Sequence, residues 1–490
     1  SVSLPTRRSR VRPPLPAPIL IMTKQQMLDV KKLFNLALKN QKKKNFHKAK
    51  KLYQEILDLN PNFLEANNNL GLLFQLDKEY DKARECYEKI IKINPKILSA
   101  QFNLGLVFQK MEKNEKAKEC YKKAIELNPK LVNAQYNLGI VFQKMGENEK
   151  AKECYKKAIE LNPKLLIAYN NLGIVYSNLG EYNLAIESYI DALEINKEFK
   201  NAKENLIHSL TCASSKRENS IVNAHNNLKK IHKNFNSLEC LKSENLNYIL
   251  RESNKILRNI EESISSIGYD ETQTYRRNTV DLNCKRHHDV FNELNLIPKF
   301  CFSCFKIQIE PKSVLDLIKL FFIFDDFSFV NNNWRKCMIE LRNGVPGAYK
   351  GFVYCSSNDE AEKILNQITP LLENHLIYNV KIKRGCTEFY EKYPNYKEIN
   401  NTEDNFMRYD PSWEHEEKKY DLKKNLNKKI SKDTLSGLSI SDFLIINNWL
   451  NYAKIIGDLS YEKIIDDFLY SEYVYKKTSS QLEFRKKEFL

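Results

Sequence analysis

Two pairs of metal-binding residue types lie close together in the sequence. Cys284 and His287 are separated by two residues, as are Cys301 and Cys304. Such a gap lets one turn present both ligands to one ion, and three cysteines with one histidine suit structural zinc. The spacing predicts a zinc site, with His288 as an alternative to His287. Two other interpretations stay open: ordinary core or surface thiols, and an iron–sulfur or redox pair.

Lysine and aromatic side chains alternate along a later segment. Alternate residues of a strand share a face, so Lys350, Phe352 and Tyr354 would lie together. Lysines of the strands predicted at 305–310 and 380–384 would join them: Lys306, Lys381 and Lys383. RNA-binding sheets stack bases on aromatic residues beside such lysines. We therefore treat Lys350, Phe352 and Tyr354 as a candidate RNA-binding set; the alternative is an ordinary sheet surface.

The run from Lys350 to Ala361 resembles the third strand and following helix of the RNA-recognition motif. It departs from that motif in being shorter. The predicted first strand also lacks the aromatic residue that the motif places on the exposed face. The resemblance implies RNA binding on the face of the sheet.

The elements that position these residues follow a long repetitive region. Glycines recur every 34 residues, at Gly71, Gly105, Gly139 and Gly173. Each is followed at constant spacing by an aromatic residue, an alanine and a tyrosine, and prolines recur at the same step between the units, at Pro61, Pro95, Pro129 and Pro163. A fixed step of this length indicates stacked repeats, here of two short amphipathic helices. The small residues let the helices approach, the tyrosine fills the groove beside them, and the proline ends the unit.

This pattern resembles the tetratricopeptide repeat over residues 30–199, in five units, of which the first has Ala37 in place of the glycine. The resemblance implies an α-solenoid whose first helices line a concave groove for a peptide of a partner. An amide ladder on these helices resembles the asparagine ladder in the repeat domain of O-linked N-acetylglucosamine transferases. The alternative is a structural role for the same asparagines. The candidate peptide-binding residues are Asn69, Asn103, Asn137, Asn171, Phe102, Tyr136, Gln109, Gln143, Lys110 and Lys144.

A different pattern begins near residue 300. Residues 305–310 alternate as a strand that buries Phe305, Ile307 and Ile309, and Ser313 and Ser357 are helix caps. Further strands are predicted at 337–341, 349–355 and 380–384, with helices after each cap. The order βαββαβ is that of a ferredoxin-like fold, an antiparallel sheet with both helices on one face.

The chain is thus expected to be mainly α: a solenoid, then a smaller α+β domain and a helical tail. Residues 1–21 are expected to be a disordered or non-native leader. The predicted segments after it are repeats at 30–199, a capping helix at 200–215, a helical linker at 216–270, the α+β domain with its candidate zinc site at 271–390, and the tail at 391–490, in which a packed helix runs from Ser441 to Ile456.

Composition limits the partners and the compartment. The net charge of +16 favours acidic partners, such as nucleic acid, although a lysine-rich solvated surface explains it equally. No apolar run is long enough to cross a membrane. Cys86, Cys120 and Cys154 recur at the repeat step, which indicates packing residues in a reducing compartment and predicts a cytoplasmic protein.

The function predicted from these features is a non-enzymatic protein-interaction scaffold. Its solenoid would hold an extended peptide, and its α+β domain would add a binding or regulatory surface. One alternative is an RNA-associated adaptor that uses the basic sheet face. Another is a metal-dependent enzyme. The only cofactor suggested by the sequence is the candidate zinc, and the sequence says nothing of the oligomeric state.

Overall fold

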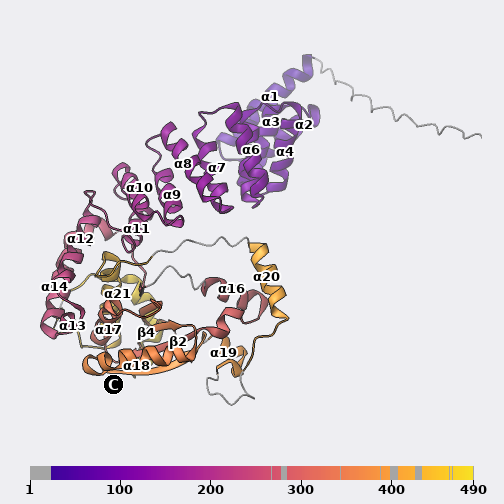
Figure 1. Cartoon of the computed structure of the whole chain (residues 1–490). Coiled ribbons are helices and arrows are strands. Elements are labelled where there is room, and N and C mark those ends of the chain that lie inside the picture. The colour runs from indigo at the N-terminus through magenta and orange to yellow at the C-terminus, as the bar shows by residue number, and fades with distance from the viewer. Residues whose placement is uncertain are drawn as a thin grey trace, which may run out of the picture. The chain divides into compact units, whose positions relative to one another are not determined.

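The computed structural model describes residues 24–265, 267–276, 284–342, 344–386, 388–397, 407–424, 433–462, 464–465 and 467–488 (Figure 1). The chain divides into two compact units, residues 1–141 and 142–490. The predicted leader, residues 1–21, lies outside the described residues.

The first unit consists of paired helices that follow the 34-residue step. They are α1 (Lys24–Lys42), α2 (Phe46–Leu59), α3 (Leu64–Leu76), α4 (Tyr80–Ile93), α5 (Leu98–Lys110) and α6 (Asn114–Leu127). Helix α7 (Val132–Lys144) crosses the boundary between the units. The helix pairs predicted from the repeat pattern are therefore confirmed.

A glycine–tyrosine contact closes the α3–α4 and α5–α6 pairs. The ring of Tyr121 in α6 lies so close to Gly105 in α5 that a Cβ atom on this glycine would stand 2.7 Å from it. Tyr87 lies against Gly71 in the same way, at 2.8 Å, and both tyrosines are fully buried. Any side chain at the glycine would have to displace the ring.

The second unit starts with a further series of helices. They are α8 (Asn148–Leu161), α9 (Leu166–Asn178), α10 (Tyr182–Ile195), α11 (Lys200–Ser209), α12 (Ser220–Lys233), α13 (Ser237–Cys240), α14 (Ser243–Asn259) and α15 (Glu261–Ser265). Within this unit α11 and α12 contact α21 (Ile440–Ile456), a helix from the last part of the chain. These helices therefore share one packed body with the α+β region.

The α+β region contains a five-stranded antiparallel sheet in the order β1-β3-β4-β2-β5. Its strands are β1 (Gln273–Arg276), β2 (Phe305–Pro311), β3 (Arg335–Ile339), β4 (Tyr349–Cys355) and β5 (Tyr378–Arg384). Helices α17 (Val314–Asp326) and α18 (Asn358–His375) contact β2 and β4 and have Ser313 and Ser357 as N-caps (Figure 1). The predicted βαββαβ order is confirmed, and β1 extends the sheet beside β3.

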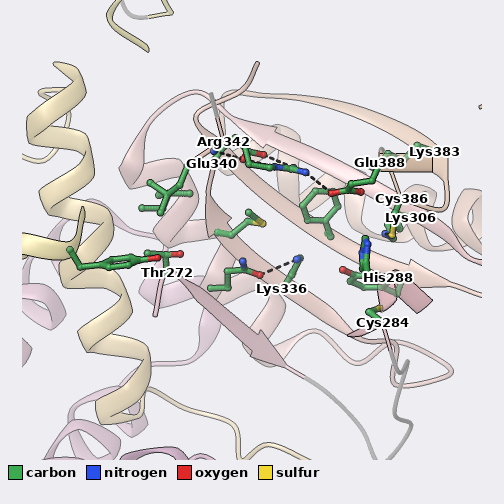
Figure 2. Close-up of a pocket in the computed structure, with 17 residues that line it drawn as sticks. Thr272, Cys284, His288, Lys306, Lys336, Glu340, Arg342, Lys383, Cys386 and Glu388 are labelled. Atoms are coloured by element: carbon green, nitrogen blue, oxygen red, sulfur yellow. Dashed lines mark hydrogen bonds and ion pairs between the residues drawn. The ribbon is translucent and has the colours of Figure 1, made fainter. Parts of the chain in front are cut away.

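The other helices of the second unit are shorter. They are α16 (Cys284–Leu294), η1 (Lys299–Ser303), α19 (Glu388–Lys392), η2 (Pro394–Lys397), α20 (Trp413–Lys424), α22 (Glu472–Thr478), η3 (Ser479–Gln481) and α23 (Leu482–Lys486). Helix α21 lies in the interior, where Trp449 is fully buried and its Nε1 donates to the carbonyl of Thr272 at 2.9 Å. The tail is therefore part of the core. The face of the sheet opposite Ile307 carries Lys306, Lys336 and Lys383, which are labelled in Figure 2.

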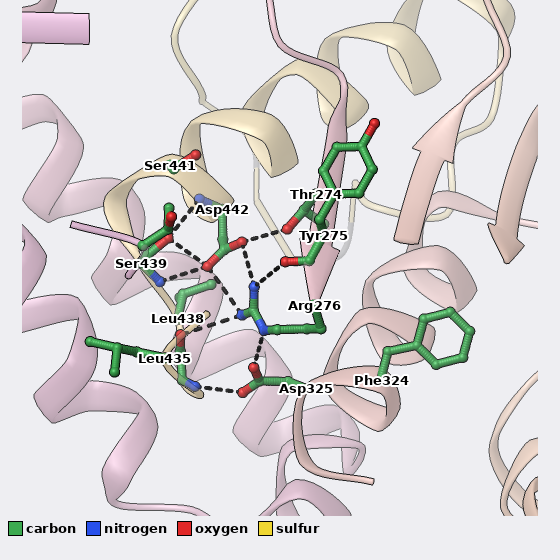
Figure 3. A network of polar contacts seen from close by, with 12 residues as sticks. Thr274, Tyr275, Arg276, Phe324, Asp325, Leu435, Leu438, Ser439, Ser441 and Asp442 are labelled. Carbon is green, nitrogen blue, oxygen red and sulfur yellow. Dashed lines mark hydrogen bonds and ion pairs between the residues drawn. The ribbon is translucent and has the colours of Figure 1, made fainter. Parts of the chain in front are cut away.

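A buried ionic network joins β1, α17 and α21 (Figure 3). The guanidinium of Arg276 donates to both carboxylate oxygens of Asp442, at 3.0 and 3.1 Å, and its Nε donates to Asp325. Thr274 donates to Asp442, and the backbone N–H of Gly437 donates to Asp325 at 2.7 Å. The side chains of all three ionic residues are at most 6% exposed, so water screens none of these charges.

No helix within the described residues is both long enough and apolar enough to cross a membrane.

Replacing Gly105 with leucine is predicted to break one helix pair. The new side chain would occupy the place of the Tyr121 ring, and overpacking of this kind costs about 1–3 kcal/mol or more. Hydrogen exchange should speed up in α5 and α6 more than in α1 and α2, because repeats contact mainly their neighbours. Lys110→Leu, on the exposed end of α5, is the control and should change little. Equal loss of protection across residues 24–141 would contradict the expectation.

Replacing Arg276 with methionine should destabilise the second unit by about 3–5 kcal/mol, because two aspartates would be left buried without their cation. Urea unfolding followed by tryptophan fluorescence measures this loss. Arg258→Met is the control: Arg258 is 32% exposed and pairs with Glu261 and Asp467, so its loss should cost about 1 kcal/mol or less. Similar losses for both variants would show that the network contributes no more than a surface pair.

Candidate functional site: a basic cavity on the sheet

A cavity of about 430 Å³ opens on the face of the sheet that does not carry Ile307 (Figure 2). Its floor comes from the strands and its rim from the start of α16, from Cys386 and Glu388, and from α22. The residues that line it are Thr272, Gln273, Cys284, His288, Lys306, Lys336, Met338, Ile339, Glu340, Leu341, Arg342, Phe352, Tyr354, Lys383, Cys386, Glu388 and Tyr473.

Lysines and aromatic rings alternate across the floor because of the strand register. Lys336 of β3 stands opposite Phe352 of β4 and Tyr275 of β1. Its Nζ lies 5.4 Å from the Phe352 ring centre and 5.8 Å from that of Tyr275. Such distances allow favourable cation–π contacts, which hold the ammonium over the rings.

A second lysine row lies beside the first. Lys306 of β2 pairs with Tyr354 on one side and with Lys383 on the other. The Nζ of Lys306 lies 5.1 Å from the Tyr354 ring centre, and that of Lys383 lies 5.3 Å from the ring centre of Phe352. Three ammonium groups and two aromatic rings thus face one cavity.

The lysines give the cavity a positive charge that would attract an anion. Burial, followed by repulsion from Lys306, lowers the pKa of Lys336 and of Lys383 to about 8. Lys336 donates to the amide oxygen of Gln273 at 3.1 Å, and Lys306 donates to the sulfur of Cys386 at 3.1 Å. An anion in the cavity would stabilise the ammonium forms and raise both pKa values.

The carboxylates that line the cavity are already paired. Glu340 accepts from Arg342 and from Lys350, each at 2.8 Å, and Arg342 also donates to Glu388. Burial alone would raise the pKa of Glu340, but these bonds lower it to about 2. The carboxylate of Glu340 therefore stays ionised without neutralising the three lysines of the floor.

The candidate RNA-binding set is only partly at this site. Phe352 and Tyr354 line the cavity, but Lys350 is 3% exposed and its ammonium is held by Glu340. The lysines that line the cavity come from other strands: Lys306 from β2, Lys336 from β3 and Lys383 from β5. The face itself is less open than predicted, since Lys306 is 6% exposed and Phe352 7%. The reason is that the start of α16, Cys386 and Glu388 border the same face, which strand alternation alone does not reveal.

A cysteine, a histidine and a glutamate meet at the rim. The Cys386 sulfur, one nitrogen of His288 and one oxygen of Glu388 all lie within 4.8 Å of one another. Cys386 and His288 share a hydrogen bond, and Figure 2 shows Lys306 beside the same sulfur. Burial alone would raise the pKa of Cys386, but the bond with His288 and the charge of Lys306 lower it to about 7.

The structure does not bring the four predicted zinc ligands together within its described residues. Cys284 and His287 share α16, but only Cys284 lines the cavity; the ring of His287 is buried and stacks on Phe300, 5.0 Å between centres. Helix α16 turns His288 toward the cavity instead. Cys301 packs in an apolar cluster with Phe389 and Tyr396, and Cys304 is buried at the end of η1.

The trio at the rim does not suit a metal ion either. The ammonium of Lys306 stands 3.1 Å from the Cys386 sulfur, where it opposes a second cation. Lys336 and Lys383 add positive charge to the same cavity. The electrostatics therefore favour a thiolate paired with cationic side chains.

Two of the predicted peptide-binding residues have an internal role. Gln109 accepts a hydrogen bond from the buried Tyr121 at 2.7 Å, and Gln143 accepts one from Tyr155 at 2.8 Å. The same bond recurs between Tyr87 and Gln75. The glutamines are thus satisfied acceptors that fix the tyrosine ring beside the glycine, a role the sequence analysis missed.

The asparagine ladder is half-buried, and its members also contact the protein. Asn69 donates to Tyr53 of the preceding helix pair at 3.3 Å, and Asn103 donates to Asn68 at 3.4 Å. Asn137 and Asn171 are half-buried, Phe102 packs on Tyr121, Tyr136 is half-buried, and Lys110 and Lys144 are exposed. Peptide binding by this set stays a prediction.

Comparisons with protein families agree with the repeat geometry. Models described as Tetratricopeptide repeat match residues 65–97 and 132–165, and a model described as TPR repeat matches residues 110–146. The N-terminal region contains tetratricopeptide repeats. The model described as Est1 DNA/RNA binding domain matches residues 151–323, which take in the later helices, β1, α16 and β2. Cys284, His288 and Lys306 of the cavity lie inside that match.

Several solved structures match about a third of the chain. The crystal structure of MamA is 28% identical and covers 33% of this chain and 95% of its own, with a TM-score of 0.33. YrrB, described as a TPR protein with an unusual peptide-binding site, is 20% identical and covers 37% and 97%, with a TM-score of 0.34. The pilF protein of Pseudomonas aeruginosa is 21% identical and covers 38% and 85%, with a TM-score of 0.34. No curated protein matches the chain. TM-scores this low do not support any conclusion about function.

Two features of the cavity escaped the sequence analysis. Alternation along residues 335–339 would have placed Lys336 on the face of Phe352, so that lysine had a local signal. The meeting of His288 with Cys386 had none, since the two residues lie far apart in the sequence and join only through the fold.

Proposed function

We propose that this protein is an adaptor that holds a protein partner through its tetratricopeptide repeats and single-stranded nucleic acid through the basic cavity. The observation that carries the second part is the alternation of Lys306, Lys336 and Lys383 with Phe352 and Tyr354 on one cavity floor. Proteins that bind single strands combine such cations, which contact phosphates, with rings on which bases stack.

The size of the cavity favours a single strand over a duplex. A volume of about 430 Å³ is that of a site for one small molecule, so one nucleotide of a strand would enter while its neighbours stay outside. The Est1 DNA/RNA binding match at residues 151–323 supports the same class of ligand, because it reaches into the cavity through α16 and β2.

The repeats supply the protein-binding half of the proposal. Asn69, Asn103 and Asn137 are half-buried on the first helices of successive pairs in the first unit. An amide donates and accepts hydrogen bonds, so a ladder of amides can hold a peptide backbone without demanding a particular sequence. Enzymatic function has no support from any matched family.

The first test removes two cavity lysines. Lys336→Gln combined with Lys383→Gln should weaken the binding of fluorescein-labelled single-stranded RNA by about tenfold, and should reduce the slope of log K against log salt by about 1.4, as two lost phosphate contacts require. Fluorescence polarisation over a salt series measures both. In the wild type, affinity should fall as the pH rises past about 8, where Lys336 and Lys383 lose their protons.

The control variant carries Lys312→Gln and Lys363→Gln, which remove the same charge from exposed positions away from the cavity. It should bind RNA almost as the wild type does. An equal loss in both double variants would mean that net charge alone attracts RNA, and no binding by the wild type would overturn the nucleic-acid half of the proposal.

The second test concerns the ladder. Asn103→Ala with Asn137→Ala should reduce the capture of a protein partner, at about 1 kcal/mol for each hydrogen bond lost, with little change in melting temperature. Gln109→Ala is the contrasting variant: it should lower the melting temperature because it leaves the buried Tyr121 hydroxyl without its acceptor. Unchanged capture together with a lower melting temperature for the asparagine variant would assign these amides to the fold.

A further inference from the structure

Cys386 sits where the chain leaves the sheet and reaches the rim of the cavity. It follows β5 by two residues and precedes α19, after Gly385, whose φ of 53° lies in the left-handed region. A Cβ at Gly385 would also collide with the buried ring of Tyr396. The turn is therefore held by packing, and it fixes the Cys386 sulfur on the cavity wall.

The groups around this sulfur are those that activate a thiol. His288 forms a hydrogen bond with the Cys386 sulfur, and the ammonium of Lys306 donates to the same sulfur at 3.1 Å. A carboxylate oxygen of Glu388 lies within 4.8 Å of both the sulfur and a ring nitrogen of His288. A nucleophile beside a base, with a third group near the base, is the arrangement that makes a thiolate available at neutral pH. Cys304 and Cys355 give the contrast: burial raises the pKa of Cys304 to about 11 and that of Cys355 to about 12.

The cavity selects the charge of a reaction partner. The sulfur shares its space with Lys306, Lys336 and Lys383, and the cavity has room for a molecule of small-peptide size. An approaching anion would be attracted, and a cation would be repelled. The co-reactant is therefore a small anionic electrophile.

We propose that Cys386 is a modification site at which a small anionic disulfide of the glutathione class forms a mixed disulfide inside the basic cavity. The Cys386 thiolate attacks one sulfur of the disulfide and forms a new S–S bond. The original S–S bond breaks, and the second half leaves as a thiolate that takes a proton from the His288 imidazolium or from water. Cys386 is oxidised and the disulfide is reduced, so no further oxidant is required.

The experiment compares two disulfides of opposite character on the full chain. Glutathione disulfide is anionic, and 2-hydroxyethyl disulfide is neutral. Peptide mapping by mass spectrometry gives the rate of adduct formation at each cysteine over a pH series. Cys386 should react with glutathione disulfide about tenfold faster than Cys284, which lines the same cavity. The rate should rise with pH and reach half its maximum near pH 7.

Variants distinguish activation of the Cys386 thiol by His288 from attraction of the anionic disulfide by the lysines. His288→Gln should move the midpoint of the pH profile upward by about one unit, toward that of an ordinary thiol, for both disulfides. Lys336→Gln with Lys383→Gln should slow glutathione disulfide several-fold and leave the neutral disulfide nearly unchanged. Cys386→Ser should abolish the adduct, and Cys284→Ser should not; melting curves verify that each variant is folded.

Two results would overturn the proposal. One is modification of Cys386 no faster than that of Cys284. The other is equal reactivity of Cys386 toward the anionic and the neutral disulfide in the wild type. Neither depends on nucleic-acid binding, so failure here leaves the proposed adaptor function intact, and loss of RNA binding leaves this chemistry untouched.

Discussion

The second unit depends on the pairing of one buried arginine with two buried aspartates. Arg276 lies on the edge strand β1, Asp325 ends α17 and Asp442 begins α21, so the three meet only when the first, middle and last parts of the unit are folded together (Figure 3). Lys229 of α12 adds hydrogen bonds to the carbonyls of Ser436 and Gly437. Burying a charge without its partner costs far more folding free energy than burying the pair. The network therefore favours the one arrangement of these elements in which all three charges are paired.

This constraint reaches the cavity through the sheet. Tyr275 next to Arg276 contacts Lys336, and Gln273 two residues earlier accepts from the Lys336 ammonium. The network thus fixes the strand that orients one wall of the site. Helix α21 completes the arrangement, because Tyr452 donates to the carbonyl of Glu340, the residue whose carboxylate holds Arg342 and Lys350. Residues at the end of the chain therefore position groups in its middle.

Sequence patterns predicted correctly those features that depend on residues close together in the chain. The 34-residue step gave the helix pairs, and alternation with Ser313 and Ser357 as caps gave βαββαβ, because each depends on neighbours in the chain. The zinc prediction used the spacing of the cysteines and histidine in the sequence, but tertiary packing decides whether their side chains meet. Phe300 stacks on His287, and Cys301 lies in an apolar cluster. The groups that do meet, His288 and Cys386, come from a helix and a loop with no shared pattern. Strand β1 was missed because four residues carry too little periodicity.

The lysines of the cavity are the physical reason to propose a ligand for this site. Burial and mutual repulsion lower the pKa of Lys336 and Lys383, so keeping them charged costs folding free energy. The nearby carboxylate of Glu340 is committed to Arg342 and Lys350, and the thiolate of Cys386 balances only part of the charge. Any anion that enters binds the folded state and not the unfolded chain, so it offsets that cost and stabilises the fold as it binds. If an anion binds there as proposed, its affinity and the stability of this domain would both depend on the charge of the same lysines.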